Sequence, residues 1–312
     1  NKKAQGAKYG FEAVEEGIIL NVSKAYYNVL KTEKTVEIKE SALKRTVEQR
    51  RVASSRFKVG DVAKTIVLRA EAEVANAEAE LANAKRDILI ARDKLSRLIG
   101  ISDDIKVIDP NIQQIPDANL EGLLSIAFEK RRNYIQSKIE EDIAGEGINY
   151  AKGNFLPSLK IDGVYSKRDQ SPKSASYNDE SIYAGVTLTF PLFEGGLRKA
   201  ELNEAKSKKR QAEFKRLNNK KDIELEVKEA FHNLEAINSV IESYKRQVSF
   251  AEENYNVVFK QFTYGLATNV DVIDANTTLV SGEKSLANAK YDKEILVVEL
   301  KKSAGILLEE MK

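Results

Sequence analysis

The sequence predicts a mainly α-helical protein with a small β part. Long antiparallel coiled-coil hairpins, arranged as two tandem structural repeats, accompany one β-hairpin. Three observations support this fold class. The chain repeats itself at a spacing of 205 residues, apolar residues recur in heptads over long segments without proline, and between the two repeats the periodicity changes from helical to alternating.

The internal repeat relates a first helical hairpin in residues 1–100 to a second in residues 195–312. Twenty of the 77 positions between residues 25 and 101 are identical to their counterparts 205 residues later. The most telling matches are Phe57 with Phe262, Gly60 with Gly265, and LANAK at 81–85 with LANAK at 286–290. Low-complexity helix could repeat one pentapeptide, but it would not also keep glycines in register. We therefore interpret the pattern as a duplication.

The first helix of the second repeat carries an uninterrupted heptad seam. Its apolar residues are Val227, Leu234, Ile241, Val248, Tyr255 and Phe262. Five heptads predict a coiled coil, and a proline-free helix from Leu197 to Phe262 would be roughly 100 Å long. The first repeat keeps one seam at Val22, Val29, Val36, Leu43 and Phe57, which Arg50 interrupts. Its other seam becomes polar at Thr32, Lys39 and Thr46. The two helices should therefore face different surroundings.

Residues 101–153 form a connector with Pro110 and Pro116, followed by short helices. Residues 154–194 then alternate between apolar and polar side chains in two segments of about ten residues, the length of a membrane-spanning β-strand. The side chains predicted to face lipid are Leu159, Ile161, Tyr165, Ile182, Val186, Leu188 and Phe190. A soluble hairpin would alternate similarly. However, a lone two-stranded hairpin is unstable and needs partners, which favours the membrane interpretation.

Composition excludes several function classes. The chain has no cysteine, so it has no disulfide, thiolate nucleophile or Cys-ligated metal, and its net charge of +2 indicates no nucleic-acid partner. The single histidine, His232, is predicted to lie on a helix surface. We find no metal-ligand spacing and no phosphate-binding loop, so we expect no enzyme activity and no cofactor.

The sequence resembles the TolC-type outer-membrane efflux family over nearly its whole length. The resemblance rests on the duplicated helical hairpins, the strand entry NFLPSLKIDG, and the tip turns FKVG and FTYG. It also includes the strand-to-helix exit TFPLFEGG, with Pro191, Gly195 and Gly196. The chain contains only one of the two β-hairpins typical of that family, so we expect it to be N-terminally truncated.

The resemblance implies a trimeric outer-membrane channel with a long periplasmic extension. Each protomer of a homotrimer would give four strands to a shared barrel in outer-membrane lipid, and its long helices would line a tunnel. The channel would be the exit duct of a tripartite efflux or type I secretion system, coupled by a periplasmic adaptor to an inner-membrane pump of the RND, ABC or MFS class. The alternative is a soluble periplasmic coiled-coil adaptor or scaffold.

The resemblance also implies a gate at the periplasmic tip. Asp271 and Asp274 lie three residues apart and would share one helix face, forming a carboxylate ring in a trimer. The alternative is an ordinary solvated first turn, where acids are favourable. The residues predicted to dock the adaptor are Phe57, Val59, Gly60, Phe262, Tyr264 and Gly265.

Two positions depart from the family pattern at the gate. The residues that hold the closed tip elsewhere in the family are replaced here by Ile66 and Ala267, so that lock does not transfer. Lys64, Arg69 or Asp61 could substitute for it.

Overall fold

A computed structural model describes residues 2–101, 106–108, 110, 119–169, 171 and 180–309, which leaves the predicted connector residue Pro116 outside. In this part of the chain the helices are α1 (Lys2–Lys58), α2 (Lys64–Ile99), α3 (Leu120–Lys130), α4 (Arg132–Gly153), α5 (Leu197–Thr263) and α6 (Asn269–Ser303). The strands are β1 (Ser158–Lys167) and β2 (Glu180–Thr189). The mainly helical fold class is confirmed. None of the described helices has a stretch that is long and apolar enough to cross a membrane.

The chain divides into two compact units. One consists of Asn1–Tyr9 with Asn133–Lys220, and the other of Gly10–Arg132 with Lys221–Lys312. The first unit holds α4, both strands and the beginning of α5. The second holds the two helical hairpins and α3. Because α1 and α5 are long, each contributes to both units.

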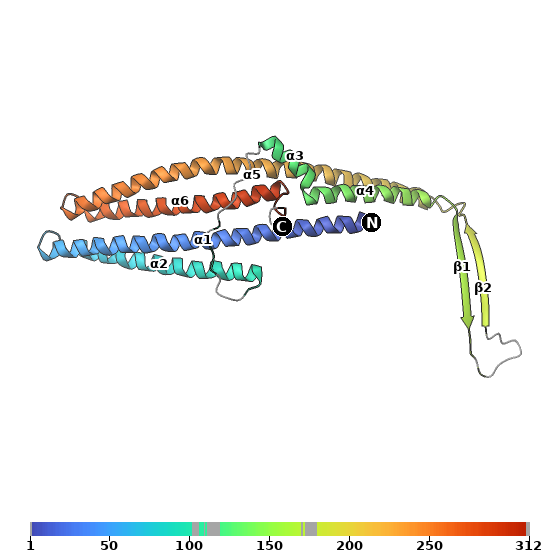
Figure 1. Ribbon diagram of the computed structural model, residues 1–312, viewed down its shortest axis with the longest axis horizontal. Coiled ribbons are helices and arrows are strands. Elements are labelled where there is room, and N and C mark those ends of the chain that lie inside the picture. Colours follow the sequence, from blue (N-terminus) through green and yellow to red (C-terminus); the bar gives the residue numbers. More distant parts are fainter. Residues whose placement is uncertain are drawn as a thin grey trace. The chain divides into compact units, whose positions relative to one another are not determined.

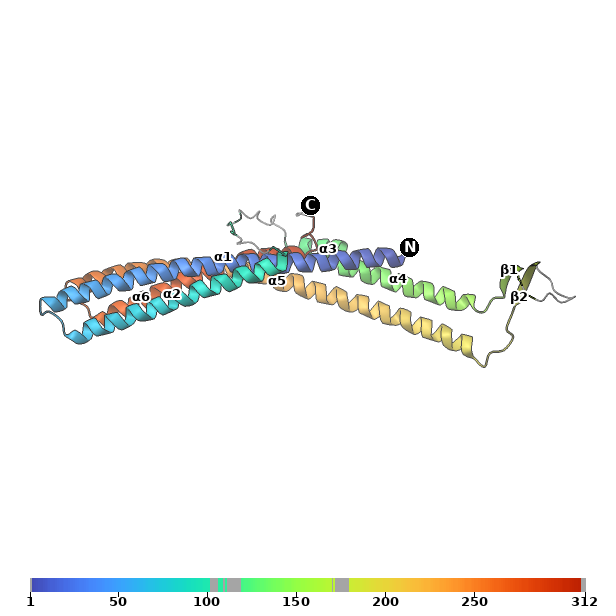
Figure 2. The ribbon, with the colours of Figure 1, turned by 90° about the horizontal axis from the view of Figure 1, so that it is seen from below.

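In the larger unit, α1 lies antiparallel beside α2, and α5 lies beside α6 (Figures 1 and 2). Each hairpin reverses at a glycine, Gly60 with φ +82° and Gly265 with φ +80°. This left-handed conformation is costly for any residue with a Cβ, so both turns require glycine. Helix α1 ends at Lys58 and α5 at Thr263, while α2 begins at Lys64 and α6 at Asn269. Each pair of boundaries is 205 residues apart.

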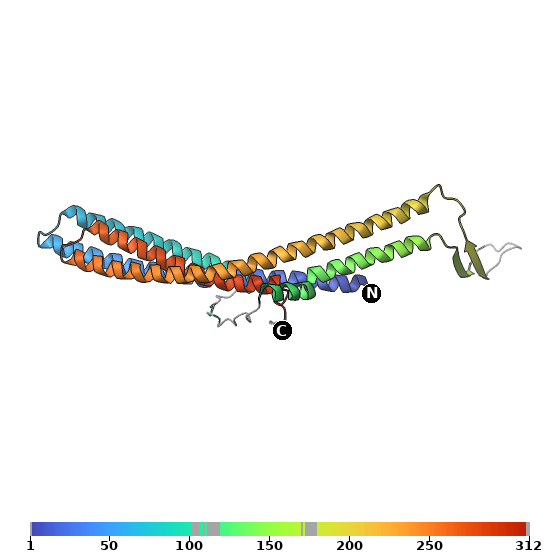
Figure 3. The same ribbon diagram turned by 90° about the horizontal axis from the view of Figure 1, so that it is seen from above.

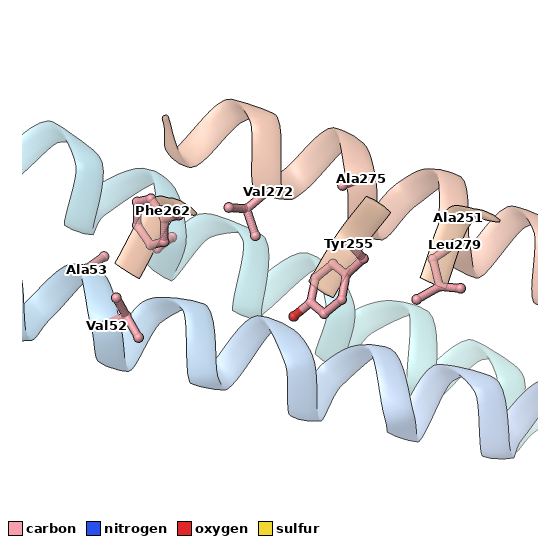
Figure 4. Packing of buried hydrophobic residues seen from close by; sticks show 9 residues of the cluster. Val52, Ala53, Ala251, Tyr255, Phe262, Val272, Ala275 and Leu279 are labelled. Atoms are coloured by element: carbon pink, nitrogen blue, oxygen red, sulfur yellow. The ribbon is translucent and has the colours of Figure 1, made fainter. Parts of the chain in front are cut away.

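The core near the two turns is built from all four long helices. Its buried residues are Val52 and Ala53 of α1, Ala70 of α2, Ala251, Tyr255 and Phe262 of α5, and Val272, Ala275 and Leu279 of α6 (Figure 4). The seam predicted for the second repeat is confirmed here, because Tyr255 and Phe262 are buried. Small residues let the helix backbones approach closely around these two rings, which fill the space between the hairpins.

The seam predicted for α1 is only partly right. Val29 is buried, but Phe57 at the end of the predicted seam is 41% exposed. Towards the turn the buried face moves to Gln49, Val52 and Ala53. A straight helix drifts about 20° per heptad, and α1 packs against more than one neighbour, so a single heptad frame does not describe its contacts.

At the other end of the larger unit, Arg131 lies between α3 and α4 and donates hydrogen bonds to the end of α6. The backbone of Arg131 is extended, with ψ 117°, so the helical stretch is interrupted there. Its guanidinium donates to the carbonyl oxygens of Lys302 and Ser303 at 3.3 Å each, two of the last four carbonyls of α6. The Lys302 carbonyl also accepts from the Gly305 backbone nitrogen at 2.9 Å. Gly305 (φ +74°) lies against this junction, where a Cβ would come within 2.8 Å of the Arg131 backbone nitrogen.

The smaller unit places the hairpin at the end of α4 and before the start of α5 (Figure 3). Strands β1 and β2 are antiparallel. On one face the pair Lys167–Glu180 at the loop end is charged, and the other four pairs are apolar or glycine. These pairs are Leu159–Leu188, Ile161–Val186, Gly163–Ala184 and Tyr165–Ile182. The opposite face carries polar pairs such as Lys160–Thr187 and Ser166–Ser181. The hairpin thus has one continuous apolar face that the chain itself leaves exposed.

Candidate functional site

The two glycine turns and the first turn of α6 form the candidate site at the tip of the helical hairpins. Three of its side chains are strongly exposed although they are apolar or aromatic: Val59 (80%), Tyr264 (80%) and Leu266 (79%). Phe262, which the sequence predicted as a docking residue, is only 1% exposed. Phe262 therefore belongs to the core next to the turn and not to the exposed surface. Leu266 was missed, because no periodic pattern extends into a turn.

Asp271 caps its own helix. Its carboxylate accepts from the backbone nitrogen of Thr268 at 2.8 Å and from the Thr268 hydroxyl at 2.7 Å, and its backbone nitrogen donates to Thr268 Oγ1 at 3.3 Å. This is a capping box, which satisfies the free amides at the start of α6. The hydrogen bonds from Thr268 lower the pKa of the Asp271 carboxyl. The corresponding start of α2, at Ala63, has no side-chain cap.

Asp274 lies one turn further along α6 and is exposed. Within the described residues, its carboxylate makes no hydrogen bond or ion pair. The two aspartates thus differ locally, since Asp271 is engaged at the helix end and Asp274 is open to solvent. The alternative interpretation of the pair, as an ordinary first turn, fits Asp271. A carboxylate ring remains a prediction for both.

Arg56 links the two hairpins at the tip. From the last turn of α1, its Nη1 donates to the carbonyl oxygen of Phe262 on α5 at 2.6 Å, and its guanidinium lies 5.2 Å from the Phe262 ring centre. Its Nε also donates to Asp61 at 2.6 Å. Of the three substitutes considered for the missing lock, only Asp61 takes part. Lys64 and Arg69 are exposed.

Further polar contacts join α1 to α6 behind the turns. The buried Gln49 amide donates to Asn269 Oδ1 at 2.8 Å. Arg45 donates to Asn276 at 2.8 Å and to Glu283 at 3.1 Å. Beyond them, Lys31 pairs with Asp292 at 2.9 Å and Lys24 with Glu299 at 2.6 Å.

The spacing of these α1 residues explains the contacts. Lys24, Lys31 and Arg45 are separated by multiples of seven, so they share one edge of α1. The sequence signal existed, but without a known neighbour these cations could not be distinguished from a solvated face.

The hairpin of the smaller unit is the second feature of functional interest. Six of the seven residues predicted to face lipid lie on the apolar face of the strands, and Phe190 follows the last residue of β2. In the exit segment, Gly195 (φ +61°) and Gly196 (φ +89°) both adopt left-handed conformations before α5 begins. Pro191 is half-buried between the strand and these glycines.

The comparison with known proteins agrees with this arrangement. A family model described as "Outer membrane efflux protein" matches residues 1–101 and 123–306. The outer membrane protein TolC of Vibrio cholerae is 29% identical, over 99% of this chain and 72% of its own length. The TolC of Escherichia coli is 25% identical, over 96% of this chain and 64% of its own length. The alkaline protease secretion protein AprF of Pseudomonas aeruginosa is 22% identical, over 96% and 63%. The chain therefore spans about two thirds of the length of these relatives.

Solved channel structures have the same fold. The CmeC outer-membrane channel of Campylobacter jejuni superposes with a TM-score of 0.85 at 18% identity, covering 98% of this chain and 66% of its own. VceC of Vibrio cholerae superposes with a TM-score of 0.83 at 19% identity, covering 97% and 73%. No enzyme family is indicated. The chain belongs to the outer membrane efflux protein family, whose members are outer-membrane channels with a periplasmic extension.

Proposed function

We propose that this chain forms, as a homotrimer, the exit duct of a tripartite efflux or type I secretion system. The hairpin of β1 and β2 would contribute to a shared β-barrel with its apolar face towards lipid, and the two helical hairpins would be tandem repeats lining a periplasmic tunnel. The observation that carries the proposal is the tip, where two glycine turns 205 residues apart share one core and present exposed apolar side chains beside the first turn of α6.

The gate of this duct would be the first turn of α6. Three protomers would bring six carboxylates, from Asp271 and Asp274, around the narrowest opening, and rings of aspartate favour cations and bind multivalent ones. The hydrogen bonds from Thr268 lower the pKa of the Asp271 carboxyl and so favour its ionised form. Because Asp271 already accepts two hydrogen bonds from Thr268, Asp274 has the greater free capacity to bind a cation.

The closed tip would be held within each protomer by Arg56 and by the contacts behind it. Arg56 replaces the family lock that Ile66 and Ala267 cannot form, because it bridges the end of α1 to the end of α5. Val59, Tyr264 and Leu266 would meet the hairpin of a periplasmic adaptor. The adaptor would connect the duct to an RND, ABC or MFS pump in the inner membrane.

Single-channel conductance in a planar bilayer tests the gate. We expect a small cation-selective conductance that multivalent cations block. The block should weaken about tenfold or more in Asp274→Asn, because half of the ring charge is lost. Asp274 is the better target, since Asp271→Asn would also weaken the helix cap. Asp93→Asn, an exposed carboxylate near the far end of α2, is the matched control.

Two results would count against the proposal in different ways. If Asp274→Asn and Asp93→Asn leave the block equally unchanged, the ring is wrong while the channel stands. If the protein remains soluble without detergent and forms no channels, the duct itself is wrong. The soluble scaffold considered from the sequence would then be the better description, although membership of a channel family argues against it.

A further inference from the structure

The beginning of α5, in the smaller unit, carries an unequal share of the charge. Residues 197–220 include nine lysines and arginines and three glutamates, which gives +6, whereas the whole chain carries only +2. The remainder of the protein is therefore net negative, at −4. This concentration of positive charge on one helix gives it a local positive potential that the net charge of the chain does not reveal.

The positive charges gather on one side of the helix. At 3.6 residues per turn, the five residues Lys199, Lys206, Lys209, Arg210 and Lys220 fall within about 100° of arc, and we call them the basic face. They extend over about 30 Å of helix axis. Glu213 is the one acidic residue of residues 197–220 within the same arc.

The basic face points away from α4, the helix that packs beside α5 in this unit. On the opposite side of α5, Lys215 pairs with Glu140 of α4 at 2.7 Å, and Glu201 accepts from Asn154 at 3.2 Å. A groove of about 540 Å³ between the two helices is likewise lined on the α5 side by Glu201, Glu204 and Lys208. All five residues of the basic face are exposed, and the contact with α4 reaches only its border, where Arg216 pairs with Glu141 at 2.5 Å.

Three of the five cations of the basic face are not neutralised by a neighbouring carboxylate in the part of the chain that the structure describes. Lys199, Lys206 and Lys209 are exposed and form no ion pair within the described residues, and Arg210 lies over the exposed ring of Phe214, 6.0 Å from its centre. Elsewhere on the same helix stretch cations do find partners, as Lys208 does with Glu204 at 2.6 Å. Lys206 and Arg210 are four residues apart, and like charges at this spacing destabilise a helix. An anionic partner would relieve that repulsion.

A helix does not require cations at these positions in order to form. The positions 205 residues upstream of Lys209, Arg210 and Lys220 are Ala4, Gln5 and Glu15, and α1 is helical there without a basic face. The charge is thus particular to α5.

We propose that the basic face binds the peptidoglycan of the periplasm through the free carboxylates of its stem peptides. The face begins about ten residues after the end of β2, in the same unit as the hairpin. The inference rests on the proposed duct, which would place this part of α5 in the periplasm. Membrane headgroups fit less well, because electrostatic attraction fades within a Debye length of about 10 Å, whereas the face continues for about 30 Å along the helix. A polymer with many carboxylates matches that length.

Co-sedimentation with purified peptidoglycan sacculi tests this proposal, using the detergent-purified protein. The test variant is Lys199→Gln, Lys206→Gln, Lys209→Gln and Arg210→Gln together. The control removes four exposed cations from α2, through Lys64→Gln, Arg69→Gln, Lys94→Gln and Arg97→Gln. We expect binding of the parent and the control at low salt, and binding about tenfold or more weaker for the test variant. Raising the salt concentration, or amidating the sacculi to remove their carboxylates, should abolish parent binding.

Several outcomes would overturn the proposal. Equal binding by parent and test variant, or undiminished binding to amidated sacculi, would exclude this face or this chemistry. Stronger retention on phosphatidylglycerol vesicles than on sacculi would assign the face to lipid. A changed ion selectivity of the channel, with sacculus binding intact, would assign it to the duct interior. The assay depends on the outer-membrane location and not on the gate, so failure of the gate would leave it standing.

Discussion

Arg56 joins the end of α1 to the end of α5 at the tip. Its side chain is only 14% exposed, and it satisfies the carbonyl oxygen of Phe262 while its guanidinium covers that ring. A partly buried cation that bridges two helix ends restricts their separation more than an exposed ion pair does.

We predict that Arg56→Gln loosens the tip. The change removes the bond to the Phe262 carbonyl and the contact with its ring, at a cost of about 1–3 kcal/mol. Single channels should open more often or conduct more in this variant. Arg51→Gln is the matched control, because Arg51 is 68% exposed and pairs with Glu48 on its own helix. Equal conductance in the two variants would show that Arg56 does not hold the tip.

Glu16 is a buried carboxyl at the opposite end of the larger unit. It is 3% exposed, and its Oε1 has no hydrogen-bond partner. Burial raises the pKa of Glu16, although Arg132, Arg131 and Lys302 face it and act in the opposite direction, while Glu12 adds to the rise. The folded protein therefore holds this proton more firmly than the unfolded chain does.

The raised pKa gives stability a defined pH dependence. Stability should fall as the pH rises from about 4.5 through the raised value, because the buried carboxyl must then ionise. We predict that Glu16→Gln flattens this fall and unfolds at a higher temperature than the parent at pH 7.5, while the two unfold alike at pH 4.5. Thermal unfolding between these pH values measures the effect. The neighbouring Glu15→Gln should keep the slope of the parent, and a slope preserved in Glu16→Gln would refute the assignment.

At the scale of the helix, α2 and α6 begin differently although they occupy equivalent places in the two hairpins. Thr268 and Asp271 form a capping box at α6, and the equivalent Ala63 and Ile66 cannot. We predict that Thr268→Ala destabilises the first turn of α6 by about 1 kcal/mol and that Ala63→Thr stabilises that of α2 by less. Amide hydrogen exchange at the two helix starts would report both changes. Unchanged exchange at Asp271 in Thr268→Ala would mean that tertiary packing alone holds this turn.

The long elements were predictable because their signals are repeated many times. The heptads predicted the long helix α5, and the glycines at 60 and 265 predicted the two turns. The alternation of apolar and polar residues predicted the paired strands β1 and β2. The tip contacts were not predictable, because an arginine such as Arg56 or Arg45 can point to solvent or to a neighbouring helix from the same position. From the sequence, Phe262 could belong either to the buried heptad seam or to the exposed turn. Its burial in the structure assigns it to the seam.

At the scale of the whole molecule, the structure leaves apolar surface uncovered on α1. Phe11 (70% exposed), Val14 (62%) and Ile18 (55%) lie at spacings of three and four residues, and so form one stripe along the helix. Single exposed apolar residues are ordinary, but a contiguous stripe of this kind marks an interaction surface. The proposed homotrimer supplies a partner for it, because a second copy would cover the stripe.

We predict that Ile18→Glu weakens the trimer. Placing a charge inside an apolar interface costs several kcal/mol when no partner pairs with it, enough to shift the protein towards monomers at micromolar concentration. Mass determination by light scattering in detergent should show a trimer for the parent and smaller species for Ile18→Glu. Ser41→Glu, an exposed position on the opposite side of α1, should remain trimeric. If Ile18→Glu stays trimeric as well, the stripe lies outside the interface and another exposed helix face must form it.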